Sequence, residues 1–242
     1  MIWNIYLIIL IYFILGSTGF YFINRRKSAD EARKSWTKFI VYFFIIHILY
    51  FSIVFNTMYF RFLAVVIIAA GALELFRIYR KSGYNKKLFF LSSFILFLMF
   101  SLGFYLFSGT EKQNILYAFL VLSIFDSFSQ ITGQLWGKNK LFPSISPNKT
   151  VEGVAGGVIV ALLSSLLLKN LLETTSFNAM VIAGGIVAFA FLGDMLASYY
   201  KRKYEVKDFS NLIPGHGGFL DRFDSLIAGG AYFTIHLYLF NM

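Results

Sequence analysis

Runs of about twenty apolar residues recur along the whole chain, and they limit its possible folds more than any other feature. A helix of that length crosses the hydrocarbon core of a bilayer, whereas a soluble core helix is usually shorter and carries one polar face. The 242 residues are 58% hydrophobic and only 14% charged, which is far from an ordinary soluble domain. We therefore predict an all-α fold, a polytopic membrane helix bundle with about eight transmembrane helices.

The apolar runs define eight predicted spans with short connections between them. These lie roughly at 2–23, 36–55, 59–76, 88–107, 115–136, 151–168, 179–199 and 225–240. The first run has no basic start and is long, so it predicts a retained helix rather than a cleaved signal peptide. Small residues recur in the sixth and seventh spans and allow close helix packing, so we expect these two at the centre of the bundle.

The positive charges alternate from side to side between the predicted spans. Nineteen of the 22 Lys and Arg residues fall on one side, and only Arg61, Lys112 and Lys169 fall on the other. The positive-inside rule then puts both termini outside and the basic loops in the cytoplasm. The net charge of +10 is explained by orientation and anionic lipid headgroups, so no nucleic-acid partner is expected. The absence of cysteine excludes disulfides and thiolate metal sites.

The stretch Ser198–Asp224 concentrates groups suited to phosphate chemistry. Its turn at 214–218 reads Pro-Gly-His-Gly-Gly, and glycine allows backbone N–H groups to approach an anion closely. Carboxylates suit a hard divalent cation, and Lys and Arg neutralise phosphate. The charged residues are Lys201, Arg202, Lys203, Lys207 and Arg222, with Glu205, Asp208, Asp221 and Asp224. The pattern predicts polyphosphate chemistry at a membrane surface; the alternative is a loop that is basic only for topology.

A second informative region begins in the fifth span. Asp126 lies near the middle of an apolar helix, where an ionisable group is costly and is by default a functional candidate; a purely structural ion pair is the alternative. Residues Ser146–Gly153 predict a helix cap, with Pro147 near the first turn and Glu152 soon after it. Lys149, beside that helix N-terminus, is suited to holding phosphate.

Two other acids lie near the cytoplasmic ends of predicted spans. Asp194 and Ser198 are four residues apart and therefore share one helix face. Glu74 has Arg77 three residues on, so the nearest explanation for it is a weak local ion pair, and we assign it no catalytic role.

These two regions together resemble the phosphatidate cytidylyltransferases, the CDP-diacylglycerol synthases. The resemblance covers roughly Asp126 to Ser225. The matching positions are Asp126, Gly133, Gly137, Lys138, Ser146, Pro147, Lys149, Thr150, Glu152, Gly153, Ser198, Lys201, Arg202, Lys207, Asp208, Pro214, His216, Gly217, Gly218, Asp221, Arg222 and Asp224. The chain departs from the family pattern at Ser129-Gln130, Gln134, Val151 and Tyr200. Gln134 stands where the family usually has Arg, so this helix has one cation fewer for binding phosphate than the family pattern.

The resemblance implies CTP-dependent cytidylyl transfer to phosphatidate, giving CDP-diacylglycerol and pyrophosphate in phospholipid biosynthesis. Its cofactor is Mg²⁺, with a second metal ion as an option. The implied catalytic residues are Lys201, Arg202, Lys207, Asp208, His216 and Arg222. The implied substrate-binding residues are Asp126, Lys138, Ser146, Lys149, Ser198, Gly217 and Gly218. Because carboxylates suit a hard divalent cation, we predict Asp194, Asp221 and Asp224 as metal ligands, with Asp194 and Asp221 as the first choice and Asp126 in support. A lipid phosphate is already ionised at neutral pH, so His216 is better read as a phosphate or structural contact than as a base.

Residues 1–242 are predicted to form a single integral membrane domain, in which 1–114 supply N-terminal spans and 115–242 the catalytic half with its signature at 198–224. We expect a bacterial inner-membrane protein whose active site faces the cytoplasm; the assembly is open between a monomer and a homodimer. Three alternatives remain. They are a CTP-dependent kinase of a lipid alcohol, a cytidylyltransferase for another lipid phosphate, and a transporter that uses Asp126 and Asp194.

Overall fold

The computed structural model describes residues 2–25, 28–213 and 217–240. Eight long helices lie in this part of the chain, one at each predicted span, which confirms the all-α bundle. They are α1 (Ile2–Asn24), α2 (Ala29–Phe55), α3 (Thr57–Lys81), α4 (Lys87–Phe107), α5 (Lys112–Trp136), α6 (Val151–Leu168), α7 (Ser176–Lys203) and α8 (Leu220–Phe240). A short 3₁₀ turn, η1 (Lys169–Leu171), follows α6.

Seven of these helices, α1 to α7, are long and apolar enough to cross a membrane, so the chain is an integral membrane protein. The eighth predicted span, α8, is not among the seven. Protein surrounds α8 on most sides, and its buried positions include Asp221, Asp224, Gly229 and Gly230. A helix that faces protein rather than lipid does not need a continuous apolar surface, and small residues suit its close packing.

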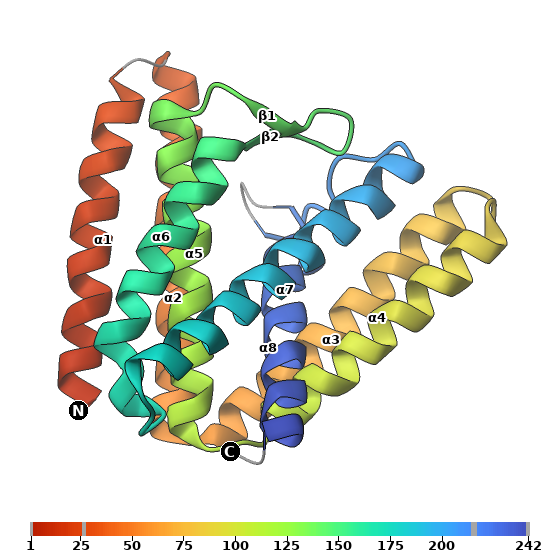
Figure 1. The fold of residues 1–242 in the computed structure, drawn as a ribbon. Coiled ribbons are helices and arrows are strands. Elements are labelled where there is room, and N and C mark those ends of the chain that lie inside the picture. The colour runs from red at the N-terminus through yellow and green to blue at the C-terminus, as the bar shows by residue number, and fades with distance from the viewer. Residues whose placement is uncertain (1, 26–27, 214–216, 241–242) are drawn as a thin grey trace.

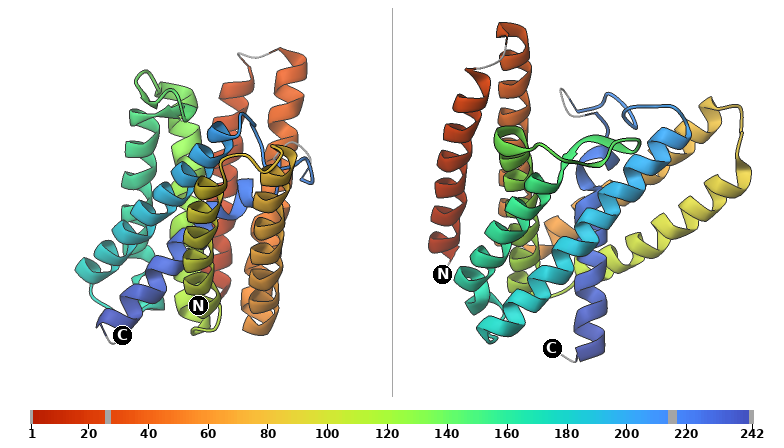
Figure 2. Two further views of the ribbon diagram at one scale, coloured as in Figure 1. Left: turned by 90° about the vertical axis from the view of Figure 1, so that its right-hand side faces the viewer. Right: turned by 45° about the horizontal axis from the view of Figure 1, so that its top comes forward.

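The helices fall into two groups with α8 between them (Figure 1). Helices α1, α2 and α5 run side by side, whereas α3, α4 and α7 are inclined to them, as the second view of Figure 2 also shows. Helix α8 packs against α4, α7, α5 and α3. The most buried helices are therefore α5 and α8, and the expectation that spans six and seven form the centre is wrong.

Small residues nevertheless set two close helix contacts, as the sequence predicted. A Cβ added at Gly157 of α6 would lie 2.7 Å from the Phe125 carbonyl oxygen of α5. A Cβ added at Gly193 of α7 would lie 2.7 Å from the Asp224 carbonyl oxygen of α8. Because no real Cβ sits this close to a carbonyl, both helix pairs depend on glycine at these positions.

An antiparallel hairpin, β1 (Lys140–Phe142) and β2 (Ser146–Thr150), covers one end of the bundle. Here the predicted helix cap at Ser146–Gly153 is wrong in its position, because Ser146 and Pro147 belong to β2. The cap is Thr150, whose Oγ1 accepts the N–H of Gly153 at 3.1 Å. Glu152 instead accepts the backbone N–H of Lys138 at 3.0 Å, which ties the helix to the turn after α5.

Several helices continue beyond the predicted apolar runs on the hairpin side. Helix α2 begins seven residues earlier than predicted, at Ala29, because Ser28 and Glu31 form a capping box there. Helices α3 and α7 continue to Lys81 and Lys203, and both have basic last turns that suit the helix C-terminus. The apolar runs mark the membrane-facing part of each helix, so they underestimate its full length.

Candidate active site

A cavity of about 750 Å³ lies among α1, α2, α5, α7 and α8, with residues of β1 and β2 in its wall. Its charged lining includes four carboxylates and four cationic side chains. These are Asp126, Asp194, Asp221 and Asp224, and Lys38, Lys140, Lys149 and Arg222. Opposite charges in one cavity of this size suit a substrate that carries several phosphates together with a cation.

Asp194 of α7 links the hairpin to the cavity. Its carboxylate forms an ion pair with Lys149 of β2, and its Oδ1 accepts a hydrogen bond from the Ser198 hydroxyl at 3.3 Å. The Asp194 side chain keeps 30% of its surface exposed, so it remains accessible from the cavity. The predicted pairing of Asp194 and Ser198 on one helix face is confirmed.

Asp126 of α5 and Asp224 of α8 face the same cavity as Asp194. The negative charge of Asp194 acts on both carboxylates, and Lys149 and Arg222 supply the opposing positive charge at Asp126. Asp224 is 9% exposed, and its Oδ1 accepts the N–H of Ser225 at 2.7 Å. Three helices thus bring three acids together that lie far apart in the sequence.

In the described residues, no three Asp, Glu or His side chains converge closely enough to hold one metal ion by themselves. This does not conflict with Mg²⁺, which usually binds one or two carboxylates and completes its shell with water and substrate phosphates. The oxygen donors of Asp126, Asp194 and Asp224 fit that mode of binding.

Asp221 has a different environment from the other three acids. Its Oδ1 accepts a hydrogen bond from the Lys201 ammonium at 2.7 Å, and its Oδ2 accepts the N–H groups of Phe209 and Gly218, each at 2.8 Å. The side chain is 1% exposed. Although Asp221 lines part of the cavity, its oxygens bind Phe209 and Gly218 and so hold the loop between α7 and α8 against the first turn of α8.

Glu74 of α3 binds the same loop from the other side, and this residue was misread in the sequence. In the described part of the chain it forms no ion pair with Arg77; it accepts hydrogen bonds from Ser210 Oγ at 2.6 Å, Phe219 N at 3.0 Å and Leu220 N at 2.8 Å. The local pairing is wrong because Glu74 points into the protein, where it is 4% exposed, while Arg77 is exposed.

The glycines of the signature turn fit between these two carboxylates. Gly217 has φ of +88°, and a Cβ there would lie 2.7 Å from Asp221 Oδ2. A Cβ at Gly218 would collide with the carboxylate of Glu74. The N–H of Gly218 donates to Asp221 and that of Gly217 to the carbonyl of Ile213, so the chain's own acceptors occupy both donors.

Several other predicted site residues lie away from the cavity lining in the described structure. Arg202 donates to the carbonyls of Ile145 at 3.1 Å and Val206 at 3.0 Å, and so joins the hairpin turn to the loop after α7. Lys138, Lys207 and Asp208 are exposed, and Ser146 lies in β2. Lys201 reaches the site through its bond to Asp221. Pro214 and His216 lie outside the described residues.

The contribution of α2 to the cavity was not expected from the sequence. Lys38 and Tyr42 of this helix line it, four residues apart on one face. The Tyr42 hydroxyl donates to the Ser123 carbonyl at 3.3 Å and accepts from Ser127 Oγ at 3.2 Å. Polar residues spaced by four inside an apolar span were the available signal. Gln134 also lines the cavity.

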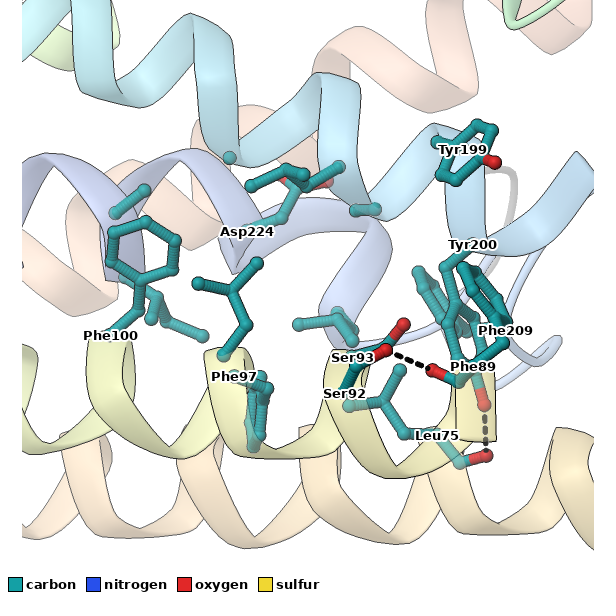
Figure 3. Close-up of a pocket in the computed structure, with 17 residues that line it drawn as sticks. Leu75, Phe89, Ser92, Ser93, Phe97, Phe100, Tyr199, Tyr200, Phe209 and Asp224 are labelled. Atoms are coloured by element: carbon teal, nitrogen blue, oxygen red, sulfur yellow. Dashed lines mark hydrogen bonds between the residues drawn. The ribbon is translucent and has the colours of Figure 1, made fainter. Parts of the chain in front are cut away.

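A second, apolar pocket of about 270 Å³ lies between α4 on one side and α7 and α8 on the other (Figure 3). Phe97 and Phe100 of α4 and Leu75 of α3 contribute to its wall, with Tyr200 near one end. Asp224 lines this pocket as well as the charged cavity. Among the described residues, Asp224 is the one that lines both spaces, so the two spaces lie next to each other.

The model of the cytidylyltransferase family matches residues 2–240. The chain belongs to the cytidylyltransferase family. Curated relatives include the phosphatidate cytidylyltransferase of Bacillus subtilis (strain 168), 42% identical over 129 residues, which are 52% of this chain and 48% of the relative. Those of Staphylococcus epidermidis (strain ATCC 12228 / FDA PCI 1200) and Staphylococcus haemolyticus (strain JCSC1435) are 40% and 41% identical over 131 residues, 52% of this chain and 50% of each relative.

The chain spans about half the length of the curated relatives that it matches. The cytidylyltransferase model reaches further, because it includes the N-terminal helices that carry Lys38 and Glu74. This coverage agrees with the structure, in which α2 and α3 both contribute to the site. Family membership is thereby established for nearly the whole chain.

Proposed function

We propose that this cytidylyltransferase-family protein transfers a cytidylyl group from CTP to phosphatidate, forming CDP-diacylglycerol and pyrophosphate. One observation carries the proposal: a cavity with four acids and four cationic side chains shares the lining residue Asp224 with an apolar pocket. A reaction between a water-soluble triphosphate and a membrane lipid needs both kinds of space next to each other. The names of the curated relatives give the same reaction class.

The chemistry requires little acid–base assistance. An oxygen of the lipid phosphate attacks the α-phosphorus of CTP, a new P–O bond forms, and the bond to the β-phosphate oxygen breaks to release pyrophosphate. The second pKa of a phosphate monoester is about 6, so the attacking oxygen is already ionised at neutral pH. Catalysis then depends on in-line positioning and on neutralising negative charge, for which Lys38, Lys140, Lys149 and Arg222 are placed.

Mg²⁺ is the cation that we propose for this site, and it would neutralise the phosphate oxygens as they approach the acids. Asp194 and Asp224 are the ligands that the geometry favours, with Asp126 in support and with room for a second ion. Asp221 was an equal sequence candidate, but its oxygens already accept three hydrogen bonds. We therefore give Asp221 an anchoring role.

The apolar pocket between α4 and α7 is the place that we propose for an acyl chain of the lipid. The lipid phosphate would then lie near Asp224, which lines both the pocket and the charged cavity. The charge asymmetry of the loops supports an active site that faces the cytoplasm, and bacterial relatives support the bacterial inner membrane as its location. A homodimer remains compatible with this arrangement.

The test uses purified protein with CTP labelled either at the α- or at the γ-phosphate, and with phosphatidate, other lipid phosphates and diacylglycerol as acceptors. We expect the α-label in CDP-diacylglycerol, the γ-label in pyrophosphate, and no product in the presence of chelator. Transfer of the γ-label to diacylglycerol would show a kinase instead. A preference for another lipid phosphate would keep the reaction type and change the substrate, the outcome for which Gln134 is the motivating residue.

A further inference from the structure

The carboxylate of Glu74 binds groups that the residues near it in the sequence do not indicate. Glu74 lies near the end of α3, and the groups that it binds follow 136 to 146 residues later. It is buried, yet it is not among the described residues that line the charged cavity. A buried carboxylate is costly unless hydrogen bonds compensate for the loss of water. Its partners therefore show what the residue does.

Two of the three partners precede α8, and the third, Leu220, is its first residue. Glu74 Oε1 accepts from Ser210 Oγ and Phe219 N, and Oε2 accepts from Leu220 N. The first N–H groups of a helix have no acceptor within the helix, and the positive end of its dipole favours a negative charge. Glu74, which lies on a different helix, supplies both a hydrogen-bond acceptor and a negative charge to the start of α8. The carboxylate thereby fixes where α8 begins.

The residues that follow this point carry the chemistry of the site. Asp221, Arg222 and Asp224 come within the first five positions of α8, so a displaced helix start moves all three. The α3–α4 pair that carries Glu74 is also tied to the C-terminal end of α7, from which the loop to α8 continues. Lys86 Nζ donates to the Lys203 carbonyl at 2.5 Å, and the Tyr200 hydroxyl donates to the Leu75 carbonyl at 2.9 Å.

We propose that Glu74 is a positioning residue for the reaction, acting through the first turn of α8 on Asp224 and Arg222. The oxygens of Glu74 bind the chain between α7 and α8, and the cavity residues bind the substrate. Only the kinetic part of this inference rests on the proposed function. The structural part concerns the start of α8 and can be measured without any substrate.

The decisive variant is Glu74→Gln, with Arg77→Gln on the same helix as the matched control. The amide keeps the shape and one acceptor oxygen, but it turns an NH₂ group toward a backbone N–H. Hydrogen exchange in peptides spanning 217–224 should become faster in Glu74→Gln and stay unchanged in Arg77→Gln. Turnover should fall by ~10²-fold in kcat while KM for CTP changes little, because the acids are displaced rather than removed.

Ser210→Ala is the milder companion, since it removes one donor and leaves the Glu74 charge in place. It should give a smaller kcat loss and a folded protein, even if Glu74→Gln folds poorly. Unchanged exchange at 217–224 in Glu74→Gln would overturn the proposal, as would normal kcat per folded molecule in both variants. If the wild type turns over none of the lipids, the proposed function fails, and the exchange measurement still decides the role of Glu74.

Discussion

Two sets of buried or half-buried carboxylates lie close together in this membrane protein and differ in what surrounds them. The loop anchors, Glu74 and Asp221, each accept three hydrogen bonds from the chain itself. The cavity acids, Asp126, Asp194 and Asp224, face a shared space and have fewer partners within the protein. Carboxylates whose oxygens are all used build the site, and those left facing the cavity can serve a substrate or a cation.

The variant Asp224→Asn is the strongest test of this division between loop anchors and cavity acids. We expect turnover to fall on the order of a thousandfold, because the variant removes a negative charge from a residue that lines both cavities. The exchange rate of the loop at 204–213 should stay at the wild-type value, since Asp224 does not hold that loop. Activity assays and hydrogen-exchange mass spectrometry on the same preparation give both quantities.

Glu205→Gln is the matched control, because it changes an exposed acid of the same loop. It should keep both activity and exchange at wild-type values. Substantial turnover in Asp224→Asn would remove Asp224 from the cavity acids.

Asp221→Asn should mainly lower the stability of the protein, whereas Asp224→Asn should mainly lower its turnover. The change leaves the buried Lys201 ammonium without its counter-charge, and breaking such a pair costs about 3–5 kcal/mol. Thermal unfolding in detergent should show a clearly lowered midpoint compared with Asp224→Asn. Equal midpoints in the two variants would contradict the division into loop anchors and cavity acids.

Gly218→Ala tests whether the anchors need glycine for their approach to the turn. The new methyl group would collide with Glu74, so we expect a loss of about 1–3 kcal/mol in the free energy of unfolding. The same change made together with Glu74→Ala should cost less, since the obstructing carboxylate is gone. Additive losses in this double-mutant cycle would show that the two residues are not in contact.

The smallest expected effect concerns the apolar pocket. Ala197→Leu fills part of its wall, so KM for a long-chain phosphatidate should rise by roughly 10-fold, the scale of a small change in a hydrophobic site, and kcat should stay similar. Val181→Leu, at an exposed position of the same helix, is the control and should change neither constant. Equal effects in both variants would place the acyl chain elsewhere.

The helices were predictable because each one shows its character within its own sequence, as an apolar run of membrane length. Asp126 and Asp224 belong to the motifs that carry the resemblance, and Asp194 was singled out by its place near the cytoplasmic end of an apolar span. Glu74 could not be assigned in the same way, because Arg77 gave it a plausible local partner and its real partners follow 136 or more residues later.

The β1–β2 hairpin was missed for a related reason. Ser146–Thr150 contains a proline and only one β-branched residue, so local propensity does not indicate a strand. The pairing with β1 and the ion pair between Lys149 and Asp194 hold it in place instead. Tertiary contacts decided both this segment and the role of Glu74.

The position of Asp224 in the walls of two unlike spaces also bears on how the products of the proposed reaction would leave the protein. Pyrophosphate is soluble only in water, and a nucleotide lipid partitions into the bilayer. In the proposed reaction, pyrophosphate would therefore leave by the charged cavity and the lipid by the apolar pocket. Neither would have to wait for the other to leave, and the return of one without the other could not reverse the reaction.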